Sequence, residues 1–243
     1  MVKKIFITGS SRGIGFGLAK KLQDDGHEVM INSNNIKNLR KASKLLNNCN
    51  YYLGDVTNIK SVKKIIKKIK IDNNKIDVLI CNYGNSAFAL NHMQIEHAFK
   101  HNFFSTVNVI EEAINILQKD TGKIICISSI CGIEVIKNAP IGYSIAKSAL
   151  NNYVKSMSHY LGNFGISINS IALGNIYFNG SVWHKKIKKN KKKTLEYINS
   201  VVPMKKFGDI DDIFELCSFM IKNKSQYTSG STFILDGGQT NKY

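Results

Sequence analysis

Residues 6–15 have the sequence FITGSSRGIG, in which an apolar run gives way to a cluster of glycines. The run is typical of a buried strand, and the apolar spacing over residues 16–22 predicts a helix. Gly9 permits a tight turn, Gly13 lets the backbone approach a phosphate, and Gly15 lets the helix lie close to the strand. The amino end of such a helix presents free N–H groups to an anion. The stretch therefore predicts a strand–turn–helix joint, and these residues alone leave open whether it also holds a phosphate.

The same alternation of strand and helix continues along the chain. Short runs rich in Ile, Val, Tyr or Phe predict strands at Lys4–Thr8, Glu28–Asn32, Asn50–Leu53, Asp77–Cys81, Lys123–Ile127, Ser167–Ala172 and Thr232–Leu235. Amphipathic segments predict helices at Ile14–Asp25, Ile36–Leu46, Ile59–Ile69, His92–Leu117, Gly142–Gly162, Lys185–Ile198 and Asp209–Ile221. This order predicts an α/β fold, a doubly wound parallel sheet with helices on both faces. Ligands of such sheets bind beyond the carboxyl ends of the strands.

Composition limits the function classes. The 243 residues contain two prolines and no Gly/Ser-rich linker, so we expect one domain over residues 1–243. The formal charge of +17 raises the question of nucleic-acid binding, but only Arg12 and Arg40 are arginines and the lysines are spread along the chain. That spread favours solvated helix faces over a specific nucleic-acid site.

The composition also bears on the cellular compartment of the protein and on whether it binds a metal. No stretch approaches the length of a membrane span, and the first apolar run is too short for a signal peptide. The five cysteines form no CxxC pair and no metal-ligand spacing. We therefore expect a cytoplasmic protein without a membrane segment or a metal site.

Further motifs accompany the glycine cluster in a fixed order. They are Asn82-Tyr83-Gly84 after a strand, Asn102 in a helical pattern, Ser129 after a strand, the pair Tyr143 and Lys147 in a YxxxK motif, and Gly174 after the next strand. With the TGxxxGxG spacing of residues 8–15, they resemble the short-chain dehydrogenase/reductase family over nearly the whole chain, and its 3-oxoacyl-[acyl-carrier-protein] reductases in particular. The resemblance implies a single Rossmann-fold domain with seven parallel strands. It also implies hydride transfer between a nicotinamide cofactor and a carbonyl or secondary alcohol.

The expected catalytic residues are Asn102, Ser129, Tyr143 and Lys147. Tyr143 and Lys147 are four positions apart on a helix and share a face, so the ammonium should lower the pKa of the phenol below its ordinary value of about 10. The phenol could then exchange a proton with a substrate oxygen. The resemblance implies that Lys147 also binds the nicotinamide ribose, that Ser129 hydrogen-bonds the substrate oxygen, and that Asn102 supports a water in the proton relay. Taken singly, the Tyr–Lys pair could be an ordinary surface pair and Asn102 an exposed helix residue.

The cofactor is expected to be NADP(H) rather than NAD(H). The second predicted strand ends at Asn32 without the acidic residue that would bind the adenine ribose hydroxyls and repel a 2′-phosphate. Arg12 lies inside the glycine cluster, where a guanidinium can grip a phosphate, and Ser33, Asn34 and Lys37 could add donors. The expected cofactor-binding residues are Thr8, Gly9, Ser11, Arg12, Gly13, Ile14, Gly15, Ser33, Asn34, Asp55, Val56, Asn82, Tyr83, Gly84, Tyr143, Lys147, Gly174 and Ile176.

Some positions leave alternatives open. The resemblance puts Asp55 at the adenine amino group, whereas a helix cap is the plainer interpretation. The spacing from Ser129 to Tyr143 is one residue longer than the commoner family spacing. The extra residue would change the entrance to the substrate pocket. Phe178 stands where a threonine is usual, which leaves the contacts to the cofactor amide open.

The substrate is the least constrained part of the prediction. Residues 177–200 lie where the family carries its substrate lid, and the lysine run at 185–193 could meet acyl carrier protein or a phosphorylated substrate, or be a solvated face. Besides a 3-oxoacyl reductase, the alternatives are an oxidoreductase for a sugar or cell-surface glycan precursor and a catalytically idle NADP-binding regulatory protein. The family also implies a homo-oligomer, a tetramer or a dimer.

Overall fold

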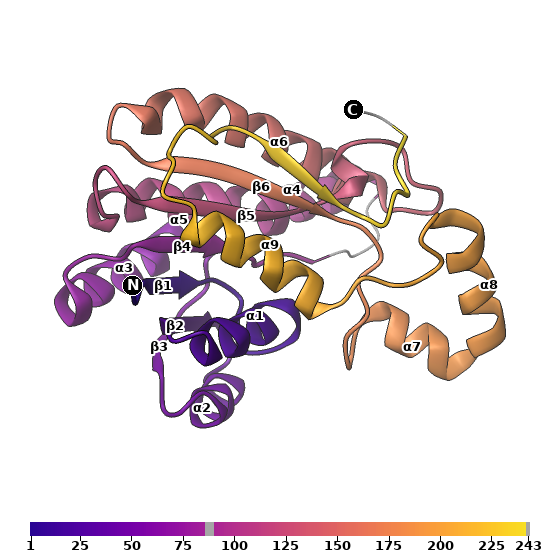
Figure 1. Ribbon diagram of the computed structural model, residues 1–243, viewed down its shortest axis with the longest axis horizontal. Helices are drawn as coiled ribbons and strands as arrows, with labels where there is room; N and C mark the ends of the chain where they lie inside the picture. The colour runs from indigo at the N-terminus through magenta and orange to yellow at the C-terminus, as the bar shows by residue number, and fades with distance from the viewer. Residues whose placement is uncertain (86–89, 242–243) are drawn as a thin grey trace.

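The computed structural model describes residues 1–85 and 90–241 and contains a seven-stranded sheet (Figure 1). All neighbouring strands are parallel, and their order is β3-β2-β1-β4-β5-β6-β7. The strands are β1 (Lys4–Ile7), β2 (Glu28–Ser33), β3 (Asn50–Leu53), β4 (Val78–Cys81), β5 (Lys123–Ser129), β6 (Ser167–Leu173) and β7 (Thr232–Leu235). The predicted α/β class is confirmed. The chain winds outward from β1 and then returns to place β4 beside β1, so the strand order reverses there and opens a crevice at the carboxyl ends of these strands.

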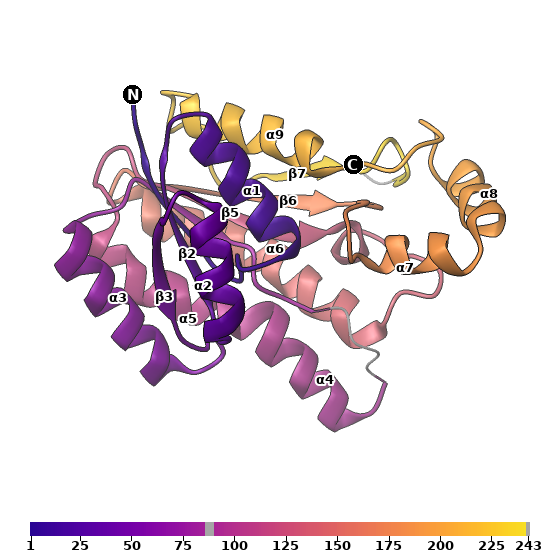
Figure 2. The ribbon, with the colours of Figure 1, turned by 90° about the horizontal axis from the view of Figure 1, so that it is seen from below.

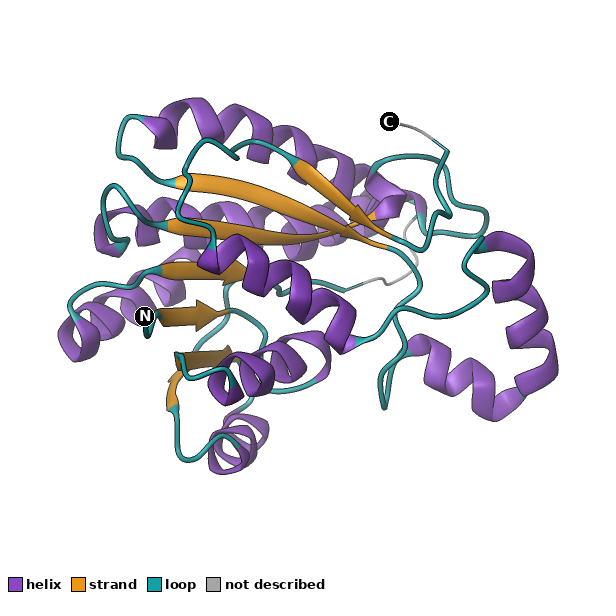
Figure 3. Ribbon diagram, viewed as in Figure 1, coloured by secondary structure: helices purple, strands orange, loops and turns teal. Residues whose placement is uncertain are grey.

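Helices cover both faces of the sheet (Figure 2). They are α1 (Gly13–Asp24), α2 (Ile36–Leu45), α3 (Ile59–Asn73), α4 (His92–Phe99), α5 (Ser105–Ala113), α6 (Ile141–Gly162), α7 (Val182–Lys189), α8 (Lys191–Val201) and α9 (Ile210–Lys222). Helices α1 and α9 pack together on one face, and α3 and α5 pack together on the other. The α7–α8 segment lies beyond the ends of the strand arrows (Figure 3), at the edge where the crevice opens.

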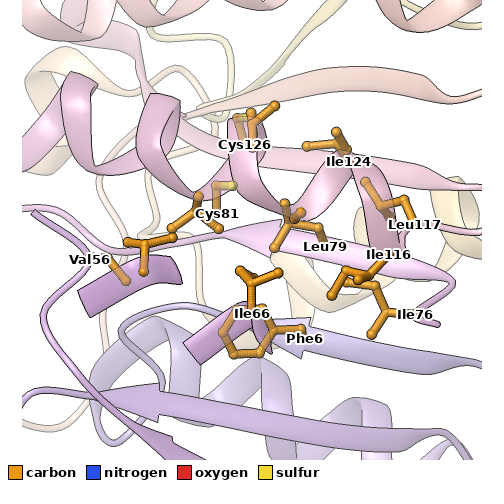
Figure 4. Close-up of a cluster of buried hydrophobic side chains, with 14 of the residues drawn as sticks. Phe6, Val56, Ile66, Ile76, Leu79, Cys81, Ile116, Leu117, Ile124 and Cys126 are labelled. Carbon is orange, nitrogen blue, oxygen red and sulfur yellow. The ribbon is translucent and has the colours of Figure 1, made fainter. Parts of the chain in front are cut away.

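The alternation of side chains along β1 separates the core into two layers. Phe6 points into the layer on the α3 face and lies near Ile66 (Figure 4). Ile5 and Ile7 point into the layer on the α1 face, where Leu18 also lies. All five of these side chains are buried, so both faces of β1 are shielded from water. This is the reason why the strands are continuous apolar runs rather than alternating ones.

Two predicted helices are interrupted. The segment predicted as one helix over His92–Leu117 contains a π-helical turn, Lys100–Phe104, between α4 and α5. The helix predicted over Lys185–Ile198 ends at Lys189, and Asn190 starts a new helix by accepting a hydrogen bond from the backbone N–H of Lys193 at 2.9 Å. Periodicity detected both segments but not their breaks. The apolar spacing continues from Phe99 to Phe104 across the first break, whereas the second break lies in the polar stretch 188–194, where no apolar residue marks the helix register.

Candidate active site

The glycine cluster forms the turn from β1 to α1. Gly9 and Gly13 have φ of +61° and +62°, backbone conformations that favour glycine. A Cβ on Gly15 would collide with the backbone of Gly9 and the side chain of Asn82, so this glycine allows the close helix–strand contact that the sequence predicted. Arg12 precedes the first turn of α1 and makes no side-chain capping bond, which leaves the N–H groups of that turn available to an anion.

Hydrogen bonds hold the glycine turn to the ends of the neighbouring strands β4 and β2. The Nδ2 of Asn82 donates to the carbonyl oxygens of Thr8 and Gly9, both at 3.0 Å. The hydroxyl oxygen of Thr8 accepts from the backbone N–H groups of Asn82 and Tyr83, at 3.1 and 3.2 Å. On the other side, Asn32 Oδ1 accepts a weaker bond from the Gly9 N–H at 3.4 Å. Thr8 is buried and therefore supports the loop from behind.

A cavity of about 710 Å³ runs along this loop and over the ends of β2, β3 and β4. Most of the residues expected to bind the adenine half of a cofactor line it: Gly9, Ser11, Arg12, Gly13, Ile14, Ser33, Asn34, Asp55, Val56, Asn82, Tyr83 and Gly84. Thr8 and Gly15 lie behind its wall, and Lys37 is not among its lining residues. Lys185, at the start of the lysine run, lines it instead.

Asp55 faces this cavity from the end of β3. Its Oδ1 accepts from the backbone N–H of Thr57 at 2.9 Å. The cap of α3 is Asn58, whose Oδ1 accepts from the N–H groups of Lys60 and Ser61 at 3.0 and 3.2 Å. The helix-cap interpretation of Asp55 is therefore wrong, because Asn58 already fills that position.

A second cavity, of about 300 Å³, joins the first at the ends of β4, β5 and β6. It is lined by all four of the residues expected to be catalytic, Asn102, Ser129, Tyr143 and Lys147, together with Gly174 and Ile176. Ser129 ends β5, and its hydroxyl accepts from the N–H of Cys131 at 3.2 Å. Ser128 also lines the cavity, and its buried hydroxyl has no hydrogen-bond partner among the described residues.

Asn102 lies in the π-helical turn and is 1% exposed, so the interpretation of an exposed helix residue is wrong. Its Nδ2 donates to the carbonyl of Ala98 at 3.0 Å, and its Oδ1 accepts from the N–H of Asn85 at 2.9 Å. A Cβ on Gly84 would lie 2.8 Å from that Oδ1 and 3.7 Å from the Nζ of Lys147. Gly84 therefore allows the amide of Asn102 and the ammonium of Lys147 to approach the same point. Single-turn π-helices are frequent at functional sites.

The relation between Tyr143 and Lys147 differs from the expectation. The Nζ of Lys147 lies 5.9 Å from the centroid of the Tyr143 ring and donates to the carbonyl of Ile127 at 2.7 Å. Burial raises the pKa of Tyr143 to about 12, against an opposing hydrogen bond with Ser129. Burial lowers the pKa of Lys147 to about 8. The predicted lowering of the phenol pKa is thus wrong for this structure, because desolvation outweighs a cation that points at a backbone carbonyl.

The burial of Lys147 predicts a pH-dependent stability. An unfolded chain keeps this ammonium charged to about pH 10, whereas the folded chain loses the proton near pH 8. The unfolded state therefore binds more protons between these values, and the contribution of Lys147 to stability rises with pH by roughly 1 kcal/mol per unit. We expect the difference in free energy of unfolding between wild type and Lys147→Met to rise accordingly from pH 8 to pH 10 in urea titrations. The exposed Lys155 on the same helix provides the matched control, and a difference that stays flat for Lys147→Met would contradict the shift.

Phe178 lies between the two cavities and lines both. A Cβ on Gly13 would lie 3.3 Å from its ring, so this aromatic side chain packs over the glycine loop. The side chain of Asn175 does not line either cavity, and its Nδ2 donates to Gln239 Oε1 at 2.6 Å. Phe178, which stands where the family usually has a threonine, therefore helps to shape the crevice.

Sequence reasoning missed three parts of this site. Asn32 anchors the glycine loop, and a polar residue inside an otherwise apolar strand was the available clue. The carbonyl of Ile127 and the N–H of Asn85 hold Lys147 and Asn102. Backbone partners of this kind leave no trace in side-chain patterns.

Comparisons with known proteins agree with this fold. The family model described as enoyl-(acyl carrier protein) reductase matches residues 9–240. The 3-oxoacyl-[acyl-carrier-protein] reductase of Buchnera aphidicola subsp. Acyrthosiphon pisum is 28% identical over 239 residues, covering 96% of this chain and 95% of that protein.

Two solved structures have the same fold. The NADPH-bound structure of a short-chain oxidoreductase from Pseudomonas aeruginosa, which contains an atypical catalytic center, superposes with a TM-score of 0.91 at 19% identity, covering 99% of this chain and 98% of that chain. A NAD⁺-bound xylitol dehydrogenase superposes with a TM-score of 0.85 at 22% identity, covering 97% of this chain and 98% of that chain.

No helix among the described residues is long and apolar enough to cross a bilayer.

Proposed function

Since this chain, matched over residues 9–240, belongs to the short-chain dehydrogenase/reductase family, we propose that it is an NADP(H)-dependent carbonyl reductase of the 3-oxoacyl-[acyl-carrier-protein] reductase type. The observation that carries the proposal is the shared cavity of Asn102, Ser129, Tyr143 and Lys147. Binding modules have no need of a phenol, a hydroxyl, an amide and an ammonium in one small cavity, which disfavours the idle regulatory alternative.

The residues present fit a dinucleotide. The uncapped first turn of α1 offers N–H groups to a pyrophosphate, and Gly13 leaves room for its approach. Arg12, Ser33 and Asn34 line the adenine end of the cavity, where they would hold a 2′-phosphate. Asp55, Val56 and Tyr83 would hold the adenine side, and Gly174 and Ile176 the nicotinamide side. When bound, the reduced nicotinamide supplies the hydride.

The chain's own residues would supply the proton. Because the pKa of Tyr143 is raised to about 12, the phenol keeps its proton at neutral pH and can donate it to a carbonyl oxygen as that oxygen gains charge. Ser129 would hydrogen-bond the same oxygen, and its hydrogen bond to Tyr143 would stabilise the phenolate that remains. Lys147 would bind the nicotinamide ribose. The amide of Asn102, already held by Asn85 and Ala98, would position the water that returns a proton.

The test is a turnover screen with purified protein, following the absorbance of NADPH or NADH. We expect NADPH-dependent reduction of 3-oxoacyl thioesters. Reduction of keto-sugars alone would support the alternative of a sugar or glycan-precursor enzyme. Binding of NADPH without turnover of either the 3-oxoacyl thioesters or the keto-sugars would contradict the proposed activity and support the idle regulatory protein.

The surroundings of the site support further parts of the proposal. Residues 177–200 would act as the substrate lid, since Val182 and Trp183 of this segment line the catalytic cavity. The Nζ of Lys186 lies 4.3 Å from the centroid of the Trp183 ring, so part of the lysine run is close enough to meet an acidic carrier or a phosphorylated substrate. Met93 on α4 and Phe104 in the π-helical turn that follows are exposed apolar side chains, which fits a homo-oligomer paired through this segment. All five cysteines are free, which fits a reducing cytoplasm.

A further inference from the structure

A cavity of about 910 Å³ lies at the other edge of the sheet, where the strands begin. Its walls include Lys3 before β1, His27 before β2, Lys123 at the start of β5, and Lys222 and Lys224 at the end of α9 and just after it. The N label in Figure 1 marks this edge, and the α7–α8 segment lies beyond the opposite one. The proposed reaction uses none of these residues.

Lys123 is a buried cation. It is 8% exposed, and its ammonium donates a long hydrogen bond of 3.4 Å to Oε1 of Gln226, the only bond that it makes among the described residues. Within residues 1–85 and 90–241, no Asp or Glu carboxylate lies within 4.0 Å of it. Burial and the neighbouring charge of Lys3 both lower its pKa. A buried charge without a partner is costly, so an anion at this place would be stabilised.

His27 adds an unpaired donor. It is 8% exposed, and its Nδ1 accepts a hydrogen bond from the backbone N–H of Lys3 at 3.3 Å. Burial lowers its pKa, so the ring is neutral at pH 7 and its proton is assigned to Nε2. That atom is buried and makes no hydrogen bond within the described part of the chain; the nearest carboxylate oxygen, Asp25 Oδ2, is 3.5 Å away. Lys222 already pairs with Asp25 at 2.9 Å and offsets its charge.

The walls are positive on balance. Among the described lining residues there are four lysines and one carboxylate, that of Asp25. Lys3 is paired with Asp77 outside the lining at 3.2 Å, so the excess positive charge comes from Lys123 and Lys224. The neutral side chains of Thr121 and Gln226 can add hydrogen bonds. The lysine bias of the whole chain does not account for Lys123, because a compositional bias fills exposed faces rather than buried strand positions. Lys3 lies beside both groups: its backbone N–H donates to His27, its charge lowers the pKa of Lys123, and its ammonium pairs with Asp77.

We propose that this amino-edge cavity binds a compact small molecule carrying at least two negative charges, as phosphate or carboxylate groups. Lys123 and the Nε2–H of His27 provide the buried donors, and Lys224 provides a cation at the rim. The site is separate from the dinucleotide crevice, and its ligand need not take part in the reaction there.

The test is calorimetric titration of the intact protein with pyrophosphate and, separately, with citrate, at constant ionic strength. We expect saturable binding of at least one of them, and Lys123→Gln should weaken it about tenfold or more, as expected for loss of a charge-assisted hydrogen bond. Lys192→Gln, which removes an exposed lysine from α8, is the matched control and should bind as wild type does. Tighter binding of pyrophosphate would assign the site to phosphates, and tighter binding of citrate to carboxylates.

Two further variants separate this site from the glycine loop. Arg12→Ala should leave the affinity unchanged, whereas Lys224→Glu, an exposed change that keeps the buried wall intact, should weaken it. Absence of saturable binding in the wild type would overturn the proposal. So would binding that survives Lys123→Gln but is lost in Arg12→Ala, since the anion would then lie in the dinucleotide crevice.

Discussion

Replacement of Tyr143 by phenylalanine is expected to lower kcat for carbonyl reduction by about 10²–10⁴-fold. The substitution removes the hydroxyl that would donate the proton and keeps the ring that lines the catalytic cavity. Because Ser129 can hydrogen-bond the substrate oxygen but is a far weaker acid, it cannot replace the phenol. Initial rates at saturating substrate and NADPH measure the effect, and thermal unfolding checks that the variant is folded.

Tyr160 provides the matched control for this substitution. It lies on the same helix, α6, and is 52% exposed on the outside of the molecule. Tyr160→Phe should therefore retain wild-type turnover. If Tyr143→Phe retained it too, the phenol would not be the proton donor, and the proposed mechanism would be lost even if NADPH still bound.

Arg12→Ala is expected to raise the KM for NADPH by about tenfold or more and to leave the KM for NADH nearly unchanged. Arg12 lines the adenine cavity with Ser33 and Asn34, and the end of β2 carries no carboxylate that would repel a 2′-phosphate. On the proposed function, the guanidinium would therefore discriminate between the two cofactors through the 2′-phosphate, the one group in which they differ. Steady-state kinetics with each cofactor measures this ratio.

Arg40→Ala is the control, because Arg40 is the other arginine of the chain and is exposed on α2. It removes the same charge from the protein without touching the cavity and should leave both KM values near wild type. Equal changes in the two KM values on Arg12→Ala would show that this arginine contributes general electrostatics and not recognition of the 2′-phosphate.

Much of the fold could be predicted because its signals are local. Strands β1, β4 and β5 are short, mostly apolar runs that are buried on both faces, and helical periodicity lies between the runs. The glycines at 9, 13 and 15 could be interpreted one by one, since each backbone or contact requirement excludes larger residues. The order of the motifs then placed Ser129 and Tyr143 at the edge where the crevice opens.

Other features depend on what lies nearby in three dimensions. The π-helical turn that buries Asn102 lies inside a regular apolar pattern, and the break at Asn190 lies inside the lysine run. The pKa of Tyr143 is raised, whereas the sequence predicted that it would be lowered. The spacing shows that Lys147 shares a helix face with Tyr143, but it does not show that the Lys147 ammonium donates to the carbonyl of Ile127. The cavity around Lys123 is formed by segments more than a hundred residues apart in the sequence, such as those of Lys123 and Gln226. A local sequence pattern therefore cannot predict it.

The sequence by itself therefore determined the strand–helix order, the parallel sheet, the family and the residues at its carboxyl edge, because periodicity and glycine stereochemistry act between near neighbours in the chain. Only the tertiary structure decided which of those residues share a cavity, which cations lack a partner and in which direction their pKa values move. Desolvation and charge pairing depend on the distances between side chains, and those distances exist only once the chain has folded.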